Sequence, residues 1–81
     1  MNFTDREKTI AALIDTFGLL IDHNDPKYFR VVPYSHYRSL GGCVIIWKDY
    51  PDAKVKDTLQ KFLIELGRRS LQKEIANLLG N

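Results

Sequence analysis

Few residues of this 81-residue chain could act as catalytic groups, and none stands in a recognised catalytic arrangement. Cys43 is the single cysteine, and a catalytic thiol needs a nearby base and an electropositive, partly open setting. His36 could supply that base only if a hairpin brings it close to Cys43. Ser35 and Ser39 lack the third group that orients the base of a triad. We therefore expect Cys43 to be a buried structural thiol, and we predict no enzyme.

A short polar segment contains side chains that metal ions use as ligands. Asp22, His23 and Asp25 lie close together in the sequence, but their spacing matches no standard calcium or transition-metal site. The polar end of a helix explains the same three residues better. The sequence therefore predicts neither a metal site nor a cofactor.

The best candidates for binding lie in an aromatic and polar segment near the middle of the chain. Tyr34, His36, Tyr37 and Arg38 occur there within five consecutive positions. Aromatic rings offer a large contact area at small entropic cost, and arginine adds a planar set of donors. These residues are predicted to bind a partner. The alternative is that both tyrosine rings pack on a sheet while His36 and Arg38 are simply solvated.

The run from Cys43 to Trp47 is apolar throughout. A strand with one face open to water should alternate apolar and polar residues, because successive side chains point to opposite faces. This run therefore requires cover on both faces, which so short a chain can hardly supply, and it indicates a partner. Trp47 is expected to belong to the core because large aromatic residues dominate small cores. If it faces outward, it becomes the main anchor for a partner.

Basic residues suggest a second class of function, nucleic-acid binding. The net charge is only +2, but acidic residues outnumber basic ones in residues 1–25 and basic residues outnumber acidic ones afterwards. No helix-turn-helix, zinc-finger, RRM or KH signature accompanies these charges, so a solvated polar face is the preferred interpretation. The residues that would bind nucleic acid in the alternative are Arg38, Lys61, Arg68 and Arg69, with Lys54, Lys56 and Lys73 nearby.

A capping box opens the first predicted helix. Thr4 can accept a hydrogen bond from the Glu7 amide, and the Glu7 side chain can reach back to the Thr4 amide. Apolar residues then recur at helical spacing and form one face. These residues are Ile10, Leu13, Ile14, Phe17, Leu20 and Ile21. The helix is expected to end at residues 23–26, because Pro26 cannot continue the hydrogen-bond ladder.

Two strands are predicted in the middle of the chain. Phe29–Val32 reads as a strand, and Pro33 removes a backbone donor, which places that strand at an edge or beside a bulge. In one register, Gly41-Gly42 forms a tight hairpin whose first strand continues through residues 34–39. In the other, Phe29–Val32 pairs with residues 45–48 and the intervening segment is a loop. The tight hairpin is preferred because long loops are uncommon in small domains.

The last third of the chain is predicted to be helical. Gly67 fits a C-terminal cap and Ser70 fits a new N-cap, so we expect a bend at Gly67–Arg69, with one continuous helix as the alternative. The predicted apolar positions are Val55, Leu59, Phe62, Leu63 and Leu66 before the bend, and Leu71, Ile75, Leu78 and Leu79 after it.

Together these elements predict a single α+β domain over residues 1–81, in the order α-β-β-α-α, with an antiparallel hairpin covered on one face by helices. The uncovered face or edge would bind protein. We therefore expect a small interaction module, acting as an adaptor, regulator or inhibitor, that forms a homodimer through the sheet or binds a larger protein. A helix-mediated dimer is the rival arrangement. One cysteine and the lack of an apolar run of about 18 residues favour a cytoplasmic, non-membrane protein.

Overall fold

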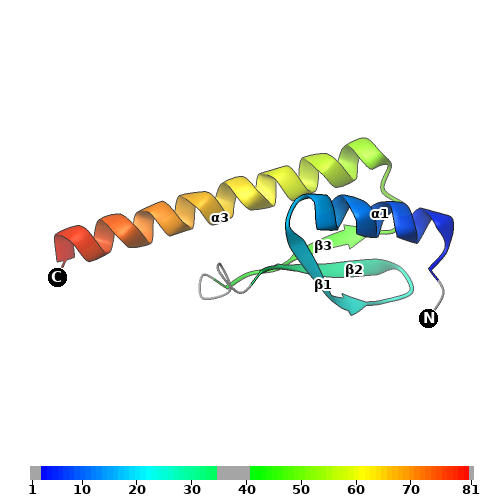
Figure 1. Ribbon diagram of the computed structural model, residues 1–81, viewed down its shortest axis with the longest axis horizontal. Helices are drawn as coiled ribbons and strands as arrows, with labels where there is room; N and C mark the ends of the chain where they lie inside the picture. The colour runs from blue at the N-terminus through cyan, green and yellow to red at the C-terminus, as the bar shows by residue number, and fades with distance from the viewer. Residues whose placement is uncertain (1–2, 35–40, 81) are drawn as a thin grey trace.

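The computed structural model describes residues 3–34 and 41–80. Its elements are α1 (Asp5–Thr16), β1 (Leu19–Asn24), β2 (Tyr28–Pro33), β3 (Val44–Trp47) and α3 (Asp52–Gly80). The strands form one antiparallel sheet in the order β1-β2-β3. Figure 1 shows α3 running alongside the sheet and then extending well beyond it. The α+β class is confirmed, but the order is α-β-β-β-α because a third strand is present.

The third strand arises because α1 is shorter than its apolar pattern suggests. The capping box forms, with Glu7 N donating to Thr4 Oγ1 at 3.1 Å and Thr4 N donating to Glu7 Oε1 at 3.0 Å. The helix then ends at Thr16, and the prediction that it continues to residues 23–26 is wrong. Gly18 follows at a φ of 72° and its amide donates to Asp15 O, which is a typical glycine helix stop.

β1 contains the apolar residues that the sequence pattern assigned to the first helix. Leu19 pairs with Pro33 and Ile21 with Val31 in an antiparallel register. The register shifts between Ile21 and His23, so one extra residue stands in β1 at that point. After Gly18 reverses the chain, the free edge of β2 provides backbone partners for this segment, which outweighs its helical periodicity.

The pairing of β2 with β3 is the looser of the two predicted arrangements. Phe29 pairs with Ile46 and Val31 with Val44. The preferred tight hairpin on Gly41-Gly42 is therefore wrong, because β2 ends at Pro33 and β3 begins only at Val44. Pro33 has no amide hydrogen to continue a ladder, which accounts for the early end of β2.

Both helices pack on the same face of the sheet. The buried residues come from α1, from α3 and from alternate positions of the strands, so the prediction of helices over one face is confirmed. The buried hydrophobic cluster consists of Ile10, Ile14, Leu19, Phe29, Val31, Ile46, Val55, Leu59 and Leu66. Arg6 adds a polar link between the helices, because its guanidinium donates to the Asp52 carboxylate and to the Tyr50 carbonyl just before α3.

α3 is one continuous helix, and the expected bend at Gly67–Arg69 is absent. Gly67 lies inside the helix rather than at its end. Glu65 reaches forward across this position to both arginines, to Arg68 at 3.8 Å and to Arg69 at 3.4 Å. Such pairs three and four residues apart stabilise a helix and help to carry it through the glycine.

A lysine on the turn after β3 connects three parts of the fold. Lys48 Nζ lies 2.8 Å from Glu7 Oε2 in α1 and 2.6 Å from Asn24 Oδ1 in β1, and it also sits 4.6 Å from the centre of the Phe29 ring. This lysine, followed by the hydrogen bonds from Thr4, lowers the pKa of Glu7 from 4.5 to about 2. The capping carboxylate of α1 is thus also a cross-link between α1 and the sheet.

The helix stop gives a first prediction. Gly18→Ala should lower the free energy of unfolding by about 1–2 kcal/mol, because an L side chain at positive φ approaches its own backbone. No other atom lies within 4 Å of the added methyl group, so no clash contributes. Gly18→Asn should lose less, since asparagine tolerates this region better. Urea unfolding followed by circular dichroism measures both, and equal stability of Gly18→Ala and wild type would contradict this explanation.

The Glu7–Lys48 link gives a prediction about pH. The folded-state pKa of Glu7 lies below its unfolded value, so its ionised form stabilises the fold above pH 4.5. This contribution is lost as the pH falls from 4.5 toward 2. Glu7→Gln should therefore reduce stability at pH 7 and change it little near pH 2. Urea unfolding at several pH values tests this. Asp57→Asn, at an exposed ion pair with Lys61, is the control and should show a smaller change at pH 7.

Candidate interaction surface on the open sheet face

The outer face of the sheet carries no helix of the described residues. Alternation along β2 points Phe29 and Val31 inward to the helices, and points Tyr28, Arg30 and Val32 to the other side. Because both helices contact the inner face, this outer surface (called the open face from here on) meets water. Its apolar members, including Val32 and Ile45, are only partly buried.

Three ring side chains form a row across the open face, one from each strand. Tyr28 of β2 lies between His23 of β1, with ring centres 6.2 Å apart, and Trp47 of β3, with centres 5.4 Å apart. The Tyr28 and Trp47 rings meet edge to face at 68°. We call His23, Tyr28 and Trp47 the aromatic row. Such edge-to-face pairs are favourable contacts that hold each ring in a defined orientation.

Trp47 is not a core residue, contrary to the sequence prediction. Its side chain is 41% exposed, whereas its neighbour Ile46 is fully buried. The register explains the difference, because Ile46 lies opposite the buried Phe29 and Trp47 lies opposite Tyr28 on the open face. The large ring is therefore available for contact with another molecule.

An ion pair lies beside the aromatic row. Arg30 of β2 donates from Nε to Asp22 Oδ1 at 2.8 Å, and both side chains are partly exposed. Asp22 raises the pKa of Arg30 above its usual value. The register places Ile45 opposite Arg30 on the same face. The open face thus combines aromatic and aliphatic surface with one fixed pair of opposite charges.

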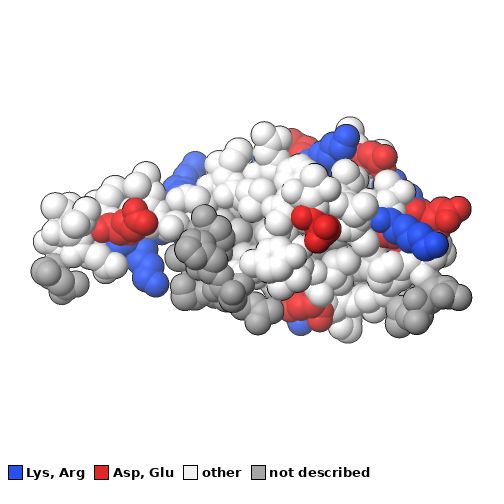
Figure 2. All heavy atoms as spheres, in the orientation of Figure 1, with Lys and Arg blue, Asp and Glu red and all other residues white. Residues whose placement is uncertain are grey.

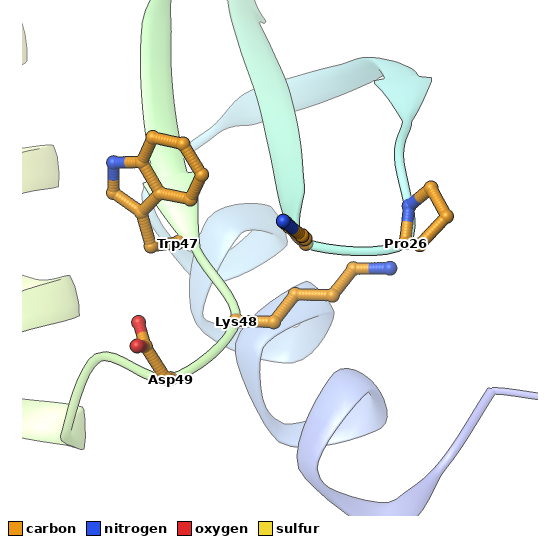
Figure 3. A pocket seen from close by; sticks show the side chains of 5 residues that line it. Pro26, Trp47, Lys48 and Asp49 are labelled. Atoms are coloured by element: carbon orange, nitrogen blue, oxygen red, sulfur yellow. The ribbon is translucent and has the colours of Figure 1, made fainter.

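An open hollow of about 500 Å³ lies at the end of the aromatic row. It is lined by Pro26 and Lys27 from the turn before β2, by Trp47 at the end of β3, and by Lys48 and Asp49 from the turn after β3. Figure 3 shows the Trp47 indole and Pro26 on opposite sides of this hollow, with the Asp49 side chain below the indole. A shallow, open hollow of this kind suits a side chain of a partner better than an enclosed small molecule.

The predicted binding segment is only partly described. Tyr34 follows β2 directly and is 42% exposed, which suits contact with a partner. His36, Tyr37 and Arg38 lie outside the described residues, so their role stays a prediction. The structure does bring Trp47 together with residues that sequence reasoning missed, Tyr28 and His23. The polar and apolar alternation of residues 28–31 was the available signal for Tyr28, whereas His23 had been assigned to a helix end.

The described basic residues of the nucleic-acid alternative each pair with a carboxylate of α3. Lys61 lies 3.0 Å from Asp57, and Arg68 and Arg69 both approach Glu65. Arg38 lies outside the described residues. Figure 2 shows charged side chains of both signs scattered over the visible surface. These pairings leave no large patch of one sign on that view of the molecule.

Cys43 is exposed, so the expectation of a buried thiol is wrong. The reason is its place in the chain, since pairing of β3 with β2 starts only at Val44. Within residues 3–34 and 41–80, no group of three or more His, Cys, Asp or Glu side chains is arranged to hold a metal ion. No helix in the same part of the chain has the length and apolar character needed to cross a membrane.

The exposure of Trp47 gives a prediction for stability. Trp47→Ala should lower the free energy of unfolding by only about 1–2 kcal/mol, because its ring is 41% exposed, while Phe29→Ala in the core should cost about 3–5 kcal/mol. Trp47 is the only tryptophan, so acrylamide quenching of native fluorescence gives an independent check. Quenching should be substantial in the folded protein. A shielded, blue-shifted native emission would contradict the outward orientation.

No protein family, curated protein sequence or solved structure matches this chain. Its function is therefore inferred from the open face and from the distribution of charges alone.

Proposed function

We propose that this chain is a small cytoplasmic protein-interaction module that binds a partner protein through the open face. The aromatic row on a sheet face that no helix of the described residues covers is the observation that carries this proposal. Exposed tryptophan and tyrosine residues contribute strongly to binding energy at protein interfaces, because they bury large area with few rotatable bonds. The single cysteine supports the cytoplasmic setting, since small secreted domains commonly contain several.

Within this proposal, Trp47 and Tyr28 are the anchors. An apolar partner side chain enters the hollow beside the Trp47 indole, while the neighbouring Asp49 and Lys27 contact polar groups at its rim. The Arg30–Asp22 pair contributes specificity, because a partner must match both charges or leave them solvated. Binding through the face is favoured over pairing along the β3 edge, because β3 has only four residues and presents few backbone groups.

A binding role also fits the state of the charged side chains near the sheet. Glu7 and Lys48 bind each other and are largely shielded from water, so these two groups serve the fold. The open face offers contact area rather than a nucleophile with an adjacent base. The proposed activity is therefore recognition, with the module acting as an adaptor, a regulator or an inhibitor of the protein that it binds.

Single-stranded nucleic acid is the second candidate partner. The observation that favours it is the row of neighbouring rings, because successive bases stack on aromatic side chains exposed on a sheet. The pairing of Lys61, Arg68 and Arg69 with carboxylates counts against it, since nucleic-acid affinity depends largely on free basic groups. Protein binding is for this reason the first proposal.

The experiment begins with affinity capture from native lysate, using wild-type protein and Trp47→Ala. A protein captured only by wild type is then purified and titrated by calorimetry. Trp47→Ala and Tyr28→Ala should each weaken binding about tenfold or more, as expected of hot-spot residues. Leu79→Ala, which removes an exposed apolar side chain at the far end of α3, is the matched control and should bind like wild type.

Nucleic acid is tested in parallel with fluorescent single-stranded DNA and RNA pools at low and moderate salt. Binding that weakens steeply with salt and is lost in Trp47→Ala would support the second candidate instead. If the purified protein partner binds Trp47→Ala and Tyr28→Ala as tightly as wild type, the open face is not its binding site and the first proposal fails.

A further inference from the structure

The rim of the hollow beside Trp47 carries two charges that the fold does not use. Among residues 3–34 and 41–80, the Asp49 carboxylate and the Lys27 ammonium group take part in no hydrogen bond or ion pair, and both residues are exposed. Lys48 also lines the hollow, but it binds Glu7 at 2.8 Å and its side chain is only 14% exposed. The charges left for another molecule are therefore one carboxylate and one ammonium group.

The carboxylate lies next to the exposed indole of the aromatic row. Asp49 follows Trp47 by two residues, and Figure 3 shows its carboxyl group turned toward the indole on the same side of the hollow. The face of an indole attracts cations, because its π electrons give it negative charge density, and a neighbouring carboxylate adds to this attraction. Both groups repel an anion. This end of the hollow therefore selects a cation.

Arginine suits this end of the hollow better than lysine does. Its guanidinium is planar, so it can stack on the indole while its N–H donors point to the Asp49 carboxylate. A guanidinium is also more weakly hydrated than an ammonium group, so it leaves water at a smaller cost. Arginine is accordingly enriched at protein interfaces, whereas lysine is depleted.

We propose that the partner protein presents an arginine whose guanidinium stacks on the Trp47 indole and pairs with the Asp49 carboxylate. This inference rests on the proposed function, because it names a partner residue that the open face recognises. The arginine lies at the rim, next to the apolar side chain that enters the hollow. Lys27 sets the opposite preference at its own position, so the partner presents an acidic or neutral residue there.

The Asp49 carboxylate also discriminates against nucleic acid. A phosphate group that approaches the Trp47 indole meets this carboxylate and is repelled. Of the two lysines that line the hollow, Lys48 is already bound to Glu7, which leaves Lys27 to attract a phosphate. One carboxylate beside the main anchor thus favours a protein segment that carries an arginine over a phosphate backbone.

Nuclear magnetic resonance with blocked amino acids tests the cation site. Trp47 is the only tryptophan, so its indole N–H gives a single reporter signal. N-acetylarginine amide should shift this signal about threefold more than N-acetylcitrulline amide at equal concentration, because citrulline has nearly the same shape but no charge. Equal shifts with the two compounds, no shift with either, or a larger shift with N-acetylglutamate amide would overturn the proposal.

Asp49→Asn removes the charge of the carboxylate and keeps its size. This variant should abolish most of the difference between the arginine and citrulline compounds, whereas Asp57→Asn, which removes an exposed carboxylate of α3, should behave like wild type. Lys27→Gln should raise the arginine response, because it removes a repelling charge. A purely structural role of Asp49 would instead lower the urea midpoint and change the response to both compounds alike, and this result would refute the contact.

The captured partner protein separates failure of this inference from failure of the proposed function. Asp49→Asn should weaken its binding about threefold, and Asp49→Arg should weaken it about tenfold or more, because like charges then meet at the rim. If Trp47→Ala and Tyr28→Ala weaken binding but both Asp49 variants bind like wild type, the open face is the binding site and the arginine contact is wrong. If none of the four variants changes the affinity, the proposed function fails as well.

Discussion

The structure depends on the burial of one face of a three-stranded sheet beneath two helices. Phe29, Val31 and Ile46 form the sheet side of this core, and residues of α1 and α3 complete it. A chain this short buries a smaller share of its surface than larger domains do, so one covered face is close to what it can supply. The open face, the exposed Trp47 and the uncovered part of α3 all follow from this limit.

The sequence was sufficient to predict the class of fold, the capping box of α1 and the helices on one face of the sheet. It was insufficient where local and long-range preferences compete. Residues 19–21 suit a helix by periodicity, but Gly18 stops α1 and the edge of β2 offers them partners. A single residue in the left-handed conformation therefore decided between two assignments that hydrophobic spacing alone could not separate.

Hydrophobic spacing alone was also insufficient to predict the candidate site. The apolar run from residue 43 to 47 correctly indicated more hydrophobic surface than the chain covers, but its register with β2 was needed to show that Ile46 points inward and Trp47 outward. His23 and Tyr28 are far from Trp47 in sequence, so only the sheet brings the aromatic row together. The exposed residues Leu71, Ile75 and Leu78 were visible as periodicity, whereas their direction relative to the core depended on the helix being continuous through Gly67.

The length of α3 beyond the sheet has a consequence for how order is distributed along the chain. Residues 71–80 are all exposed, so burial in the core does not protect their helical hydrogen bonds. This part of α3 is expected to open and close locally at a small cost in free energy, whereas Val55, Leu59 and Leu66 hold the earlier part of the helix on the sheet. The open face would therefore keep its shape while the end of α3 frays, so recognition there needs only the covered part of the fold.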